Sequence, residues 1–515
     1  MSAQPARAET TAATWMLIVA LVTLRFALPL LTRQSSWGIH RDEFLYFAMA
    51  DHFDLFRMQF PPMIAAIAGT GRAIFGDSVL AARVPAALGG AALTAVVLCA
   101  VRRLGGGTLG CLLAWLAMLA APLFVRTSLL MQPVIVDQLL ATVAIAALTL
   151  AAHEREPRWW IAVGVGLGLG ALNKFSIAFV GASVAVAVLC DPSLRGQLRT
   201  RWPWYAVLIG ATLSLPSVTG QIVHGWPFLQ QMQSLRDGQL DRVTMSEFLS
   251  GQLTMLAGAL VCVLAAVASA MRGGARERVP VIAAACLVLL MLAFHGKAYY
   301  AGPAYPMLVA TGALALERLA ERRRVVRYAL PTALLATTIM LWPIGIPVFS
   351  PAGMMRYTSA LGIAEATKTN RGETLQLPQD YADMLGWREL ADSVGAVIAR
   401  LPASERADLT LVGGNYGEAG ALAFYRTRAG LPYPVSTAGD FWAWGSGTGS
   451  GRTVIVVGDR DAGATLGKLF ARVDVAMELT NPLLVPEEQR VVIYRAADPR
   501  APIAAIWPSL GPNWR

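Results

Sequence analysis

The chain has 515 residues, of which 55% are hydrophobic and only 15% are charged, and its mean hydropathy is +0.51. Average soluble proteins carry roughly 25% charged residues, so the composition excludes an ordinary soluble domain and predicts a polytopic membrane protein. The net charge of +10 lies in short basic clusters between apolar runs, without interleaved aromatic residues. This pattern favours membrane lipids as partners and argues against nucleic acid.

Apolar runs long enough to cross a bilayer follow one another over the first 349 residues. The longest run, 158–190, has Asn173 and Lys174 at its centre. One helix of that length would hold the Lys174 charge at mid-bilayer, at a cost of roughly 2.5–3.5 kcal/mol, so two short helices that meet at this pair are expected. With that run divided, about eleven transmembrane helices are predicted, in the runs 13–33, 80–101, 108–126, 132–152, 158–190, 203–223, 248–271, 279–294, 302–317 and 328–349.

Loop charge supports eleven spans with a cytoplasmic N-terminus. On this topology the cytoplasmic loops hold fifteen arginines, whereas a ten-span topology would place eleven of them outside. Cytoplasmic loops carry an excess of basic residues, so the eleven-span topology is preferred. The outer face then receives the tail after residue 349, the pair Asn173-Lys174 and four further segments, which are the first outer loop 34–79, 126–131, 224–247 and 295–302.

The tail, 350–515, changes in composition and is predicted to be a soluble, periplasmic α/β domain that follows a transmembrane domain, 1–349. Short β-type runs alternate there with helical stretches, at 379–400 (helix), 409–412 (strand), 415–427 (helix), 454–457 (strand), 461–471 (helix) and 491–494 (strand). The Gly/Ser loop 445–451 lacks the phosphate-loop pattern, so nucleotide binding is not expected.

Asp42 and Glu43 lie in a polar segment directly after the first span. An acidic pair at the mouth of a span is costly unless it faces water, a cation or a reacting group. Glycosyl transfer to a hydroxyl needs a carboxylate that accepts the proton, and Asp42 and Glu43 are candidates for this catalytic role. The alternative is that Asp42 caps the helix that starts near Glu43. Asp137 is a third candidate acid, with a structural hydrogen bond to a neighbouring helix as its alternative.

Lys174 and Lys297 are candidates to bind a phosphate group. A phosphate at the membrane surface needs cationic hydrogen-bond donors, and both lysines lie at predicted helix junctions on the outer face. Anchoring to lipid head groups and an interfacial aromatic belt are the alternatives for these residues and for the tyrosines beside them. The further candidates for phosphate binding are Arg41, Arg126, Tyr299 and Tyr300.

His40 and His295 are candidates for binding a divalent metal or for contacting the acceptor. Both lie on the predicted outer side, but no HxxxH or similar spacing supports a metal site, and the sequence requires no cofactor. The five cysteines lie in or at the ends of apolar segments without CxxC spacing, so neither a redox centre nor a cysteine-bound metal is predicted.

Several of these segments together resemble a family of bacterial membrane glycosyltransferases of the GT-C class. Its members are similar to the protein O-mannosyltransferases and to the aminoarabinose and galacturonic acid transferases of lipid A (glycosyltransferase families 39 and 83). The segments that carry the resemblance are Arg41-Asp42-Glu43 with the aromatic-rich helix after it, Pro61-Pro62, Asn173-Lys174, Gly296 to Tyr300, Tyr305-Pro306, Tyr381 to Trp387 and Asn415 to Gly420.

This resemblance implies a GT-C fold and a polyprenyl-phosphate-linked sugar donor. Asp42 matches the catalytic base of the first loop, and Asp137 matches the acid early in the fourth span. Lys174 or Lys297 would correspond to the residues that bind the donor phosphate. Relatives often have Asp or His just before the paired prolines, where this chain has Gln59-Phe60, so a metal or acceptor contact made there is not carried over.

The expected function is that of a multi-pass glycosyltransferase of the bacterial inner membrane. It would move a sugar, with inversion, from a polyprenyl-phosphate donor to a hydroxyl of a lipid, glycan or protein acceptor at the periplasmic face. A transporter or flippase of lipid-linked sugars is one rival, which the scarcity of charge within the spans disfavours. A polysaccharide ligase or polymerase that uses diphosphate donors is the other.

Overall fold

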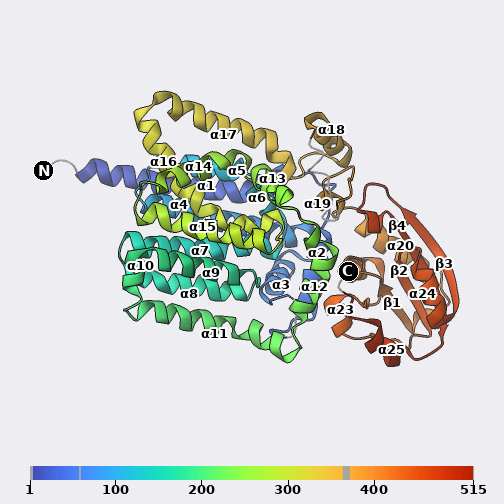
Figure 1. Ribbon diagram of the computed structural model, residues 1–515. Coiled ribbons are helices and arrows are strands. Elements are labelled where there is room, and N and C mark those ends of the chain that lie inside the picture. Colours follow the sequence, from blue (N-terminus) through green and yellow to red (C-terminus); the bar gives the residue numbers. More distant parts are fainter. Residues whose placement is uncertain (1–3, 57–59, 363–371, 514–515) are drawn as a thin grey trace.

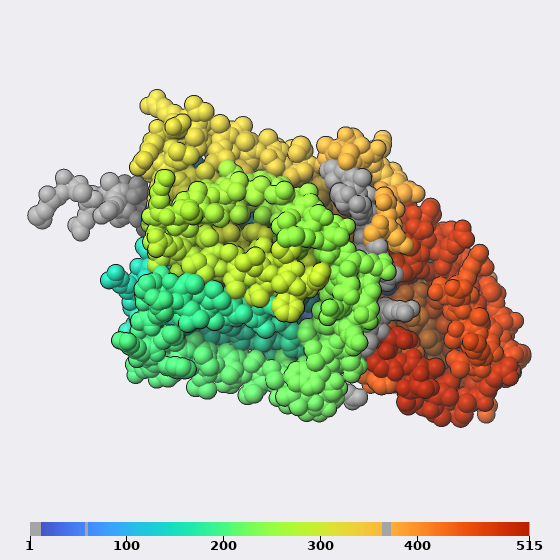
Figure 2. All heavy atoms as spheres, viewed as in Figure 1, coloured from blue at the N-terminus to red at the C-terminus, as the bar shows by residue number. Residues whose placement is uncertain are grey.

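The computed structural model describes residues 4–56, 60–362 and 372–513. Long helices form a bundle, and an α/β part covers one end of it (Figure 1). Helix α1 (Gln4–Thr32) projects beyond the bundle at the opposite end (Figure 1). The space-filling view shows the two parts in contact, with α12 (Pro227–Gly238) beside the junction (Figure 2).

The predicted polytopic helical fold is confirmed. Within the described residues, six segments are long and apolar enough to cross a membrane, namely Ala12–Thr32 in α1, α4 (Val79–Arg103), α7 (Pro133–His153), α11 (Trp202–Val223), the pair α13–α14 (Met245–Ala270) and α17 (Arg324–Gly345). The other predicted spans coincide with helices that are shorter or more charged, which are α5 (Thr108–Leu119), α8 (Trp160–Ala171), α9 (Ile177–Cys190), α15 (Ala275–Ala293) and α16 (Pro306–Arg322). A helix therefore occupies each of the eleven predicted positions.

The long apolar run is divided at the predicted place. Helix α8 ends at Ala171 and α9 begins at Ile177, with Asn173 and Lys174 between them. The buried Asn173 amide donates a hydrogen bond to the Pro133 carbonyl at 2.9 Å. This hydrogen bond links the break between α8 and α9 to the first residue of α7. It also pairs a carbonyl inside the bundle, which would be costly to leave without a partner.

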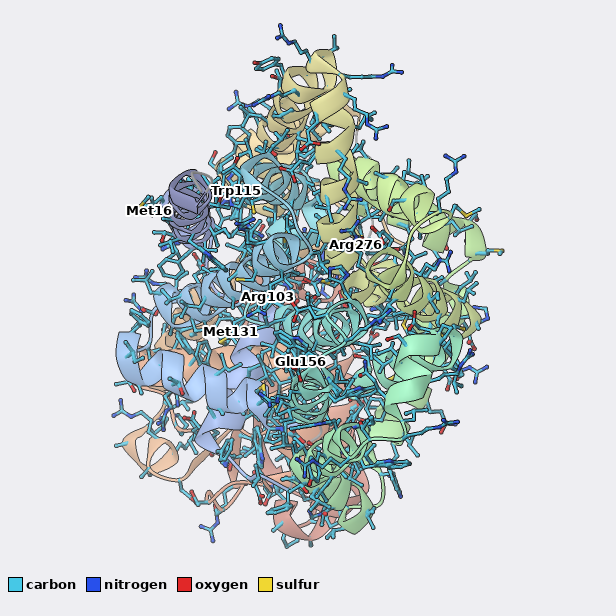
Figure 3. The ribbon with its side chains drawn as sticks, turned by 90° about the vertical axis from the view of Figure 1, so that its left-hand side faces the viewer. Met16, Arg103, Trp115, Met131, Glu156 and Arg276 are labelled. Carbon is cyan, nitrogen blue, oxygen red and sulfur yellow. The ribbon has the colours of Figure 1, made fainter. Side chains whose placement is uncertain are left out.

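The arginine-rich loops that were predicted to be cytoplasmic lie at the end of the bundle away from the α/β part. Arg276 donates to the Leu104 carbonyl at 3.2 Å, and Arg103 forms an ion pair with Glu154 at 3.5 Å. Figure 3 is a view from this end and labels Arg103 and Arg276. Basic residues thus gather opposite the segments predicted to form the site.

Two short helices, α2 (Arg41–Asp51) and α3 (Met63–Phe75), follow α1 and precede α4 in the chain, and they lie at the end of the bundle that faces the α/β part (Figure 1). Helix α2 begins where it does because His40 and Glu43 form a capping box. The Asp42 amide donates to His40 Nδ1 at 3.1 Å, and the His40 amide donates to Glu43 Oε2 at 2.7 Å. Other short helices of the bundle include α6 (Pro122–Thr127), α10 (Pro192–Gln197) and the 3₁₀ segment η4 (Ala298–Ala304).

The α/β part contains a four-stranded sheet of order β1-β2-β4-β3, in which β1 and β2 are parallel and the other neighbours antiparallel. Its strands are β1 (Leu409–Gly413), β2 (Thr453–Gly458), β3 (Phe470–Thr480) and β4 (Arg490–Pro499). Its helices are α18 (Pro351–Leu361), α19 (Gln379–Ala382), α20 (Trp387–Ala399), α21 (Ala403–Arg406), α22 (Tyr416–Ala429), α23 (Gly439–Ala443), α24 (Ala462–Leu469) and α25 (Ile503–Leu510). The predicted α/β tail is confirmed, whereas β3 was not foreseen. The domain boundary at residue 349 stays a prediction.

Helix α2 packs directly against α22. The Phe44 ring lies 5.6 Å from that of Phe424 and 5.8 Å from that of Trp387, in edge-to-face arrangements. Gly420 allows this close approach, because a Cβ there would lie 2.8 Å from the Phe44 Cβ and 3.1 Å from the Leu45 amide nitrogen. One apolar cluster therefore runs from α2 and α3 into the sheet, and it joins the first outer loop to the α/β part.

Candidate active site

Asp42 receives one hydrogen bond on each carboxylate oxygen. The Gln132 side-chain amide donates to Oδ2 at 2.9 Å, and the Tyr416 hydroxyl donates to Oδ1 at 2.9 Å. Gln132 is the residue before α7, and Tyr416 is the first residue of α22. Three segments that are far apart in the sequence therefore meet at this one carboxylate.

The alternative in which Asp42 caps α2 is wrong. His40 occupies the N-cap position, and Asp42 is the second helical residue, with its carboxylate directed at Gln132 and Tyr416. The helix is capped two residues earlier than predicted, because the His40 ring accepts the Asp42 amide proton and the Glu43 carboxylate accepts the His40 amide proton.

Glu43 is fully buried and holds the loop together. Its carboxylate forms an ion pair with Arg83 and accepts hydrogen bonds from the Met131 amide at 2.8 Å and the His40 amide at 2.7 Å. Arg83 also donates to the Gly38 carbonyl at 2.7 Å. This enclosed geometry favours a structural part for Glu43, and the predicted catalytic role stays a prediction.

Asp137 and Lys174 lie close together, near the two adjacent tyrosines of η4. Asp137 is buried, and its Oδ2 accepts a hydrogen bond from the Ser176 hydroxyl at 3.1 Å. The Lys174 ammonium lies 4.5 Å from the centre of the Tyr300 ring and 5.9 Å from that of Tyr299, within the range of cation–π attraction. Lys174 is also within electrostatic range of Asp137.

Tyr300 interacts electrostatically with Asp42 and with both lysines that are predicted to bind phosphate. Its phenol is within electrostatic range of Lys297, Lys174 and Asp42, and its ring lies 4.7 Å from that of Tyr299. The Lys297 ammonium donates to the Gln239 side chain at 2.6 Å, in the loop after α12. Lys174 thus lies beside both tyrosines, and Lys297 and the candidate base act electrostatically on Tyr300.

Arg41 and His295 lie in other surroundings. The Arg41 guanidinium is 3.7 Å from Glu487 and 4.0 Å from Glu488, and it lies over the Tyr416 ring at 4.8 Å. Its described partners belong to the α/β part, so the geometry does not favour a contact with the donor phosphate. His295 Nδ1 lies 3.3 Å from the Val243 carbonyl and borders a mostly apolar cavity of about 150 Å³.

His40 and Asp383, both buried, form a cluster with the partly exposed Asp380, and neither aspartate was predicted to lie beside the histidine. Its Nε2 lies 3.7 Å from Asp380 Oδ1 and 3.7 Å from Asp383 Oδ2, and the three ligand atoms fall within 4.8 Å of one another. Asp380 also pairs with Arg126, so Arg126 contacts the α/β part. Burial raises the pKa of Asp383 to about 6, against the opposing effect of His40.

This cluster does not fit a metal ion well. A histidine that binds a metal through Nε2 donates its Nδ1 proton to a second partner. Here Nδ1 of His40 instead accepts the Asp42 amide proton, so a neutral ring carries its proton on Nε2, where the metal would bind. The three side chains are therefore arranged as a histidine N–H that faces two carboxylates, and this arrangement differs from that of metal ligands.

Three residues near Asp42, namely Gln132, Arg83 and Tyr416, were not predicted from the sequence. Gln132 is the first residue of the predicted span 132–152, and Arg83 lies inside an apolar run, where an isolated arginine in a span is itself a signal of function. Tyr416 was noted only within a motif of the tail. Gln59, which departs from the pattern of relatives, lies outside the described residues.

The comparisons with known proteins bear on the fold of the chain. The model of the dolichyl-phosphate-mannose-protein mannosyltransferase family matches residues 59–219. No curated protein matches the chain. ArnT from Cupriavidus metallidurans bound to undecaprenyl phosphate is 15% identical, with a TM-score of 0.60 and coverage of 93% of this chain and 97% of that chain. ArnT of the same organism in the apo state is also 15% identical, with a TM-score of 0.57 and coverage of 94% and 98%.

Similarity at this level of identity establishes a shared fold over nearly the whole length of both chains. Together, the family match and the fold support the coarse class predicted from the sequence, a multi-pass membrane glycosyltransferase that uses a lipid-linked sugar. The predicted resemblance to GT-C membrane glycosyltransferases is confirmed, and the chain has an ArnT-like GT-C fold.

Proposed function

We propose that this protein transfers a sugar from a polyprenyl-phosphate donor to an acceptor hydroxyl, with inversion, at the periplasmic face of the bacterial inner membrane. The observation that carries the proposal is the convergence of Asp42 with Lys174, Lys297 and Tyr300. A general base and a set of phosphate-binding cations thus lie at one end of the bundle, as a transfer from a lipid phosphate requires.

Asp42 is the proposed base. A carboxylate has about four lone-pair sites, and the hydrogen bonds from Gln132 and Tyr416 occupy one on each oxygen. A lone pair therefore remains on either oxygen to accept the proton of an acceptor hydroxyl. The two donors also hold the plane of the carboxylate, whose terminal torsion is otherwise broad.

Lys174 and Lys297 are the proposed ligands of the donor phosphate, with Tyr299 and Tyr300 beside them. Both lysines lie at helix junctions and not within a span, where a phosphate at the membrane surface can reach them. Asp137 balances the charge of Lys174 from inside the bundle. The polyprenyl chain would extend from this phosphate into the bilayer, and ArnT was solved with undecaprenyl phosphate bound.

The proposed reaction is a single displacement. The acceptor oxygen forms a bond to the anomeric carbon while Asp42 takes the hydroxyl proton. The bond between that carbon and the phosphate oxygen breaks, and its electron pair leaves with the lipid phosphate, whose added negative charge the lysines stabilise. Attack from the face opposite the leaving group inverts the configuration of the anomeric carbon.

The test is transfer by the purified protein in proteoliposomes. A panel of undecaprenyl-phosphate-linked sugars is supplied with envelope lipids, glycans and proteins, and mass spectrometry measures released undecaprenyl phosphate and glycosylated product. Asp42→Asn should lower the transfer rate about 10²–10⁴-fold, the usual contribution of a general base. The control is Asp51→Asn, which changes an acid at the other end of α2 that pairs with Arg72.

Three outcomes would reject the proposal. Near-native transfer by Asp42→Asn in a correctly folded protein would show that Asp42 is not the general base, and it would reject the proposed mechanism. Transfer only from diphosphate-linked donors would instead assign the protein to the ligases or polymerases. Movement of the intact lipid-linked sugar across the bilayer, without product, would identify a flippase.

A further inference from the structure

The catalytic carboxylate receives one of its two hydrogen bonds from the α/β part. The Tyr416 hydroxyl donates to Asp42 Oδ1 at 2.9 Å across a sequence separation of 374 residues. Gln132, which donates to the other oxygen, belongs to the bundle. Without Tyr416 the carboxylate would therefore keep a single donor and could rotate about its terminal torsion.

Tyr416 is chemically suited to remain a donor. Burial raises the pKa of Tyr416 well above its ordinary value, and the negative charge of Asp42 raises it further. The phenol therefore stays protonated at neutral pH and can donate its hydrogen to the carboxylate. The hydrogen bond is directed from the tyrosine to the carboxylate.

The position of Tyr416 is fixed from both sides. Asn415 caps α22 by accepting hydrogen bonds from the Gly417 and Glu418 amides, so the first residue of that helix has a set direction. On the other side, Arg41 lies over the tyrosine ring at 4.8 Å. Gly417 permits this stacking, because a Cβ at that position would lie 2.6 Å from the Arg41 Cγ.

Arg41 is itself held by acidic residues of the α/β part. Its guanidinium pairs with Glu487 and Glu488, and Glu488 accepts a hydrogen bond from the Asn415 side chain at 2.9 Å. Glu418 lies against Glu488, and burial, followed by this neighbouring carboxylate, raises the pKa of Glu418 to about 8. The positive charge of Arg41 is therefore paired with carboxylates of the protein itself.

We propose that Tyr416 is a positioning residue that completes the active site, so that docking of the α/β part sets the orientation of the catalytic base. Arg41 holds the tyrosine ring in place. This inference rests on the proposed function. It gives the α/β part a role in the chemical step, whereas Lys174 and Lys297 of the bundle bind the lipid donor.

The test is Tyr416→Phe, which removes the hydroxyl and keeps the ring under Arg41. The rate constant kcat should fall about 10- to 100-fold, the range expected when a reacting group is displaced by a fraction of an ångström to an ångström. The KM for the lipid-linked donor and the binding of undecaprenyl phosphate alone should stay unchanged. Tyr433→Phe is the matched control, because that hydroxyl reaches Asp51 at 3.4 Å, at the other end of α2.

The variant pair Asp42→Asn and Asp42→Asn/Tyr416→Phe separates this inference from the function on which it rests. If Tyr416 acts through Asp42, the second substitution should not lower the residual rate of the first. An equal fall in both backgrounds, or a change in undecaprenyl phosphate binding, would overturn the inference. Native transfer by Tyr416→Phe beside an inactive Asp42→Asn would overturn it too, and would leave the proposed function intact.

A further variant covers the case in which Tyr416→Phe does not fold. Arg41→Met removes the cation over the ring and keeps the hydroxyl, and it should give a smaller fall in kcat with the same KM for the donor. A rise in KM with unchanged kcat would instead show that Arg41 binds the donor phosphate, and the positioning role would be rejected.

Discussion

The buried ion pair between Glu43 and Arg83 offers the sharpest test of how the first outer loop is held. Glu43 has no exposed surface and Arg83 is 2% exposed. Arg83→Met would leave the Glu43 charge buried with only the Met131 and His40 amides as donors. Breaking a buried pair by removing one partner costs about 3–5 kcal/mol, so Arg83→Met should lower the stability of the folded protein by that amount.

The double variant Glu43→Gln/Arg83→Met should cost less than Arg83→Met alone. It removes both charges, and the glutamine oxygen still accepts one of the two backbone hydrogen bonds. The remaining loss is one unsatisfied amide and the lost donors to the Gly38 and Leu129 carbonyls, about 1–3 kcal/mol in all. The double variant should therefore recover about 2 kcal/mol of the stability that the single substitution removes, which is the difference between the midpoints of the two ranges.

Unfolding by titration with sodium dodecyl sulfate from mixed micelles, followed by tryptophan fluorescence, compares the variants. Hydrogen exchange of the peptide that covers residues 37–46 reports on the loop itself. Arg83→Met with native stability and native exchange would refute the argument for a buried pair. Transfer activity of the double variant is a second measurement. A stable and active double variant would show that Glu43 is structural, whereas a stable but inactive one would support the predicted catalytic role.

Three further results are expected. Lys174→Met and Lys297→Met should each weaken binding of undecaprenyl phosphate about tenfold or more, the loss of a charge-assisted contact, and unchanged binding in both would remove the lysines from the donor site. Incubation with EDTA should leave transfer unchanged, and a loss that zinc or manganese restores would show that the histidine–aspartate cluster binds metal after all. Gly420→Ala should lower stability by about 1–3 kcal/mol through overpacking against α2, whereas Gly467→Ala, which meets no atom within 4 Å, should not, as thermal unfolding in detergent can measure.

The helical part of the fold was predictable because the bilayer imposes a length and a polarity on every span. The division of the run 158–190 followed from one charge, Lys174, which could not remain at mid-bilayer. Strand β3 was not predicted, because most of its residues are exposed at the edge of the sheet and several are charged. An edge strand of this kind carries little of the apolar alternation that identifies a strand.

The candidate site was predictable only in part. Asp42 and the lysines were predicted because a charged residue next to a membrane span is costly unless it has a partner or a function. Only the neighbouring residues in the sequence are needed to recognise such a residue. Tyr416 and Asp380 could not be found in the same way. Their contacts with the first outer loop depend on how the α/β part docks, and no pattern within either segment encodes that docking.

The dependence of the base on the α/β part also follows from the burial of α2. Every residue from Glu43 to Met49 is buried, so the middle of this helix has no face for water and is covered by the bundle on one side and by the α/β part on the other. Its aromatic face needs α22, and the close approach at Gly420 brings the start of α22, with Tyr416, to the start of α2. The apolar contact that folds the helix is thus the same contact that delivers a hydrogen-bond donor to Asp42. Folding of the first outer loop and alignment of the proposed base are, for this reason, one event.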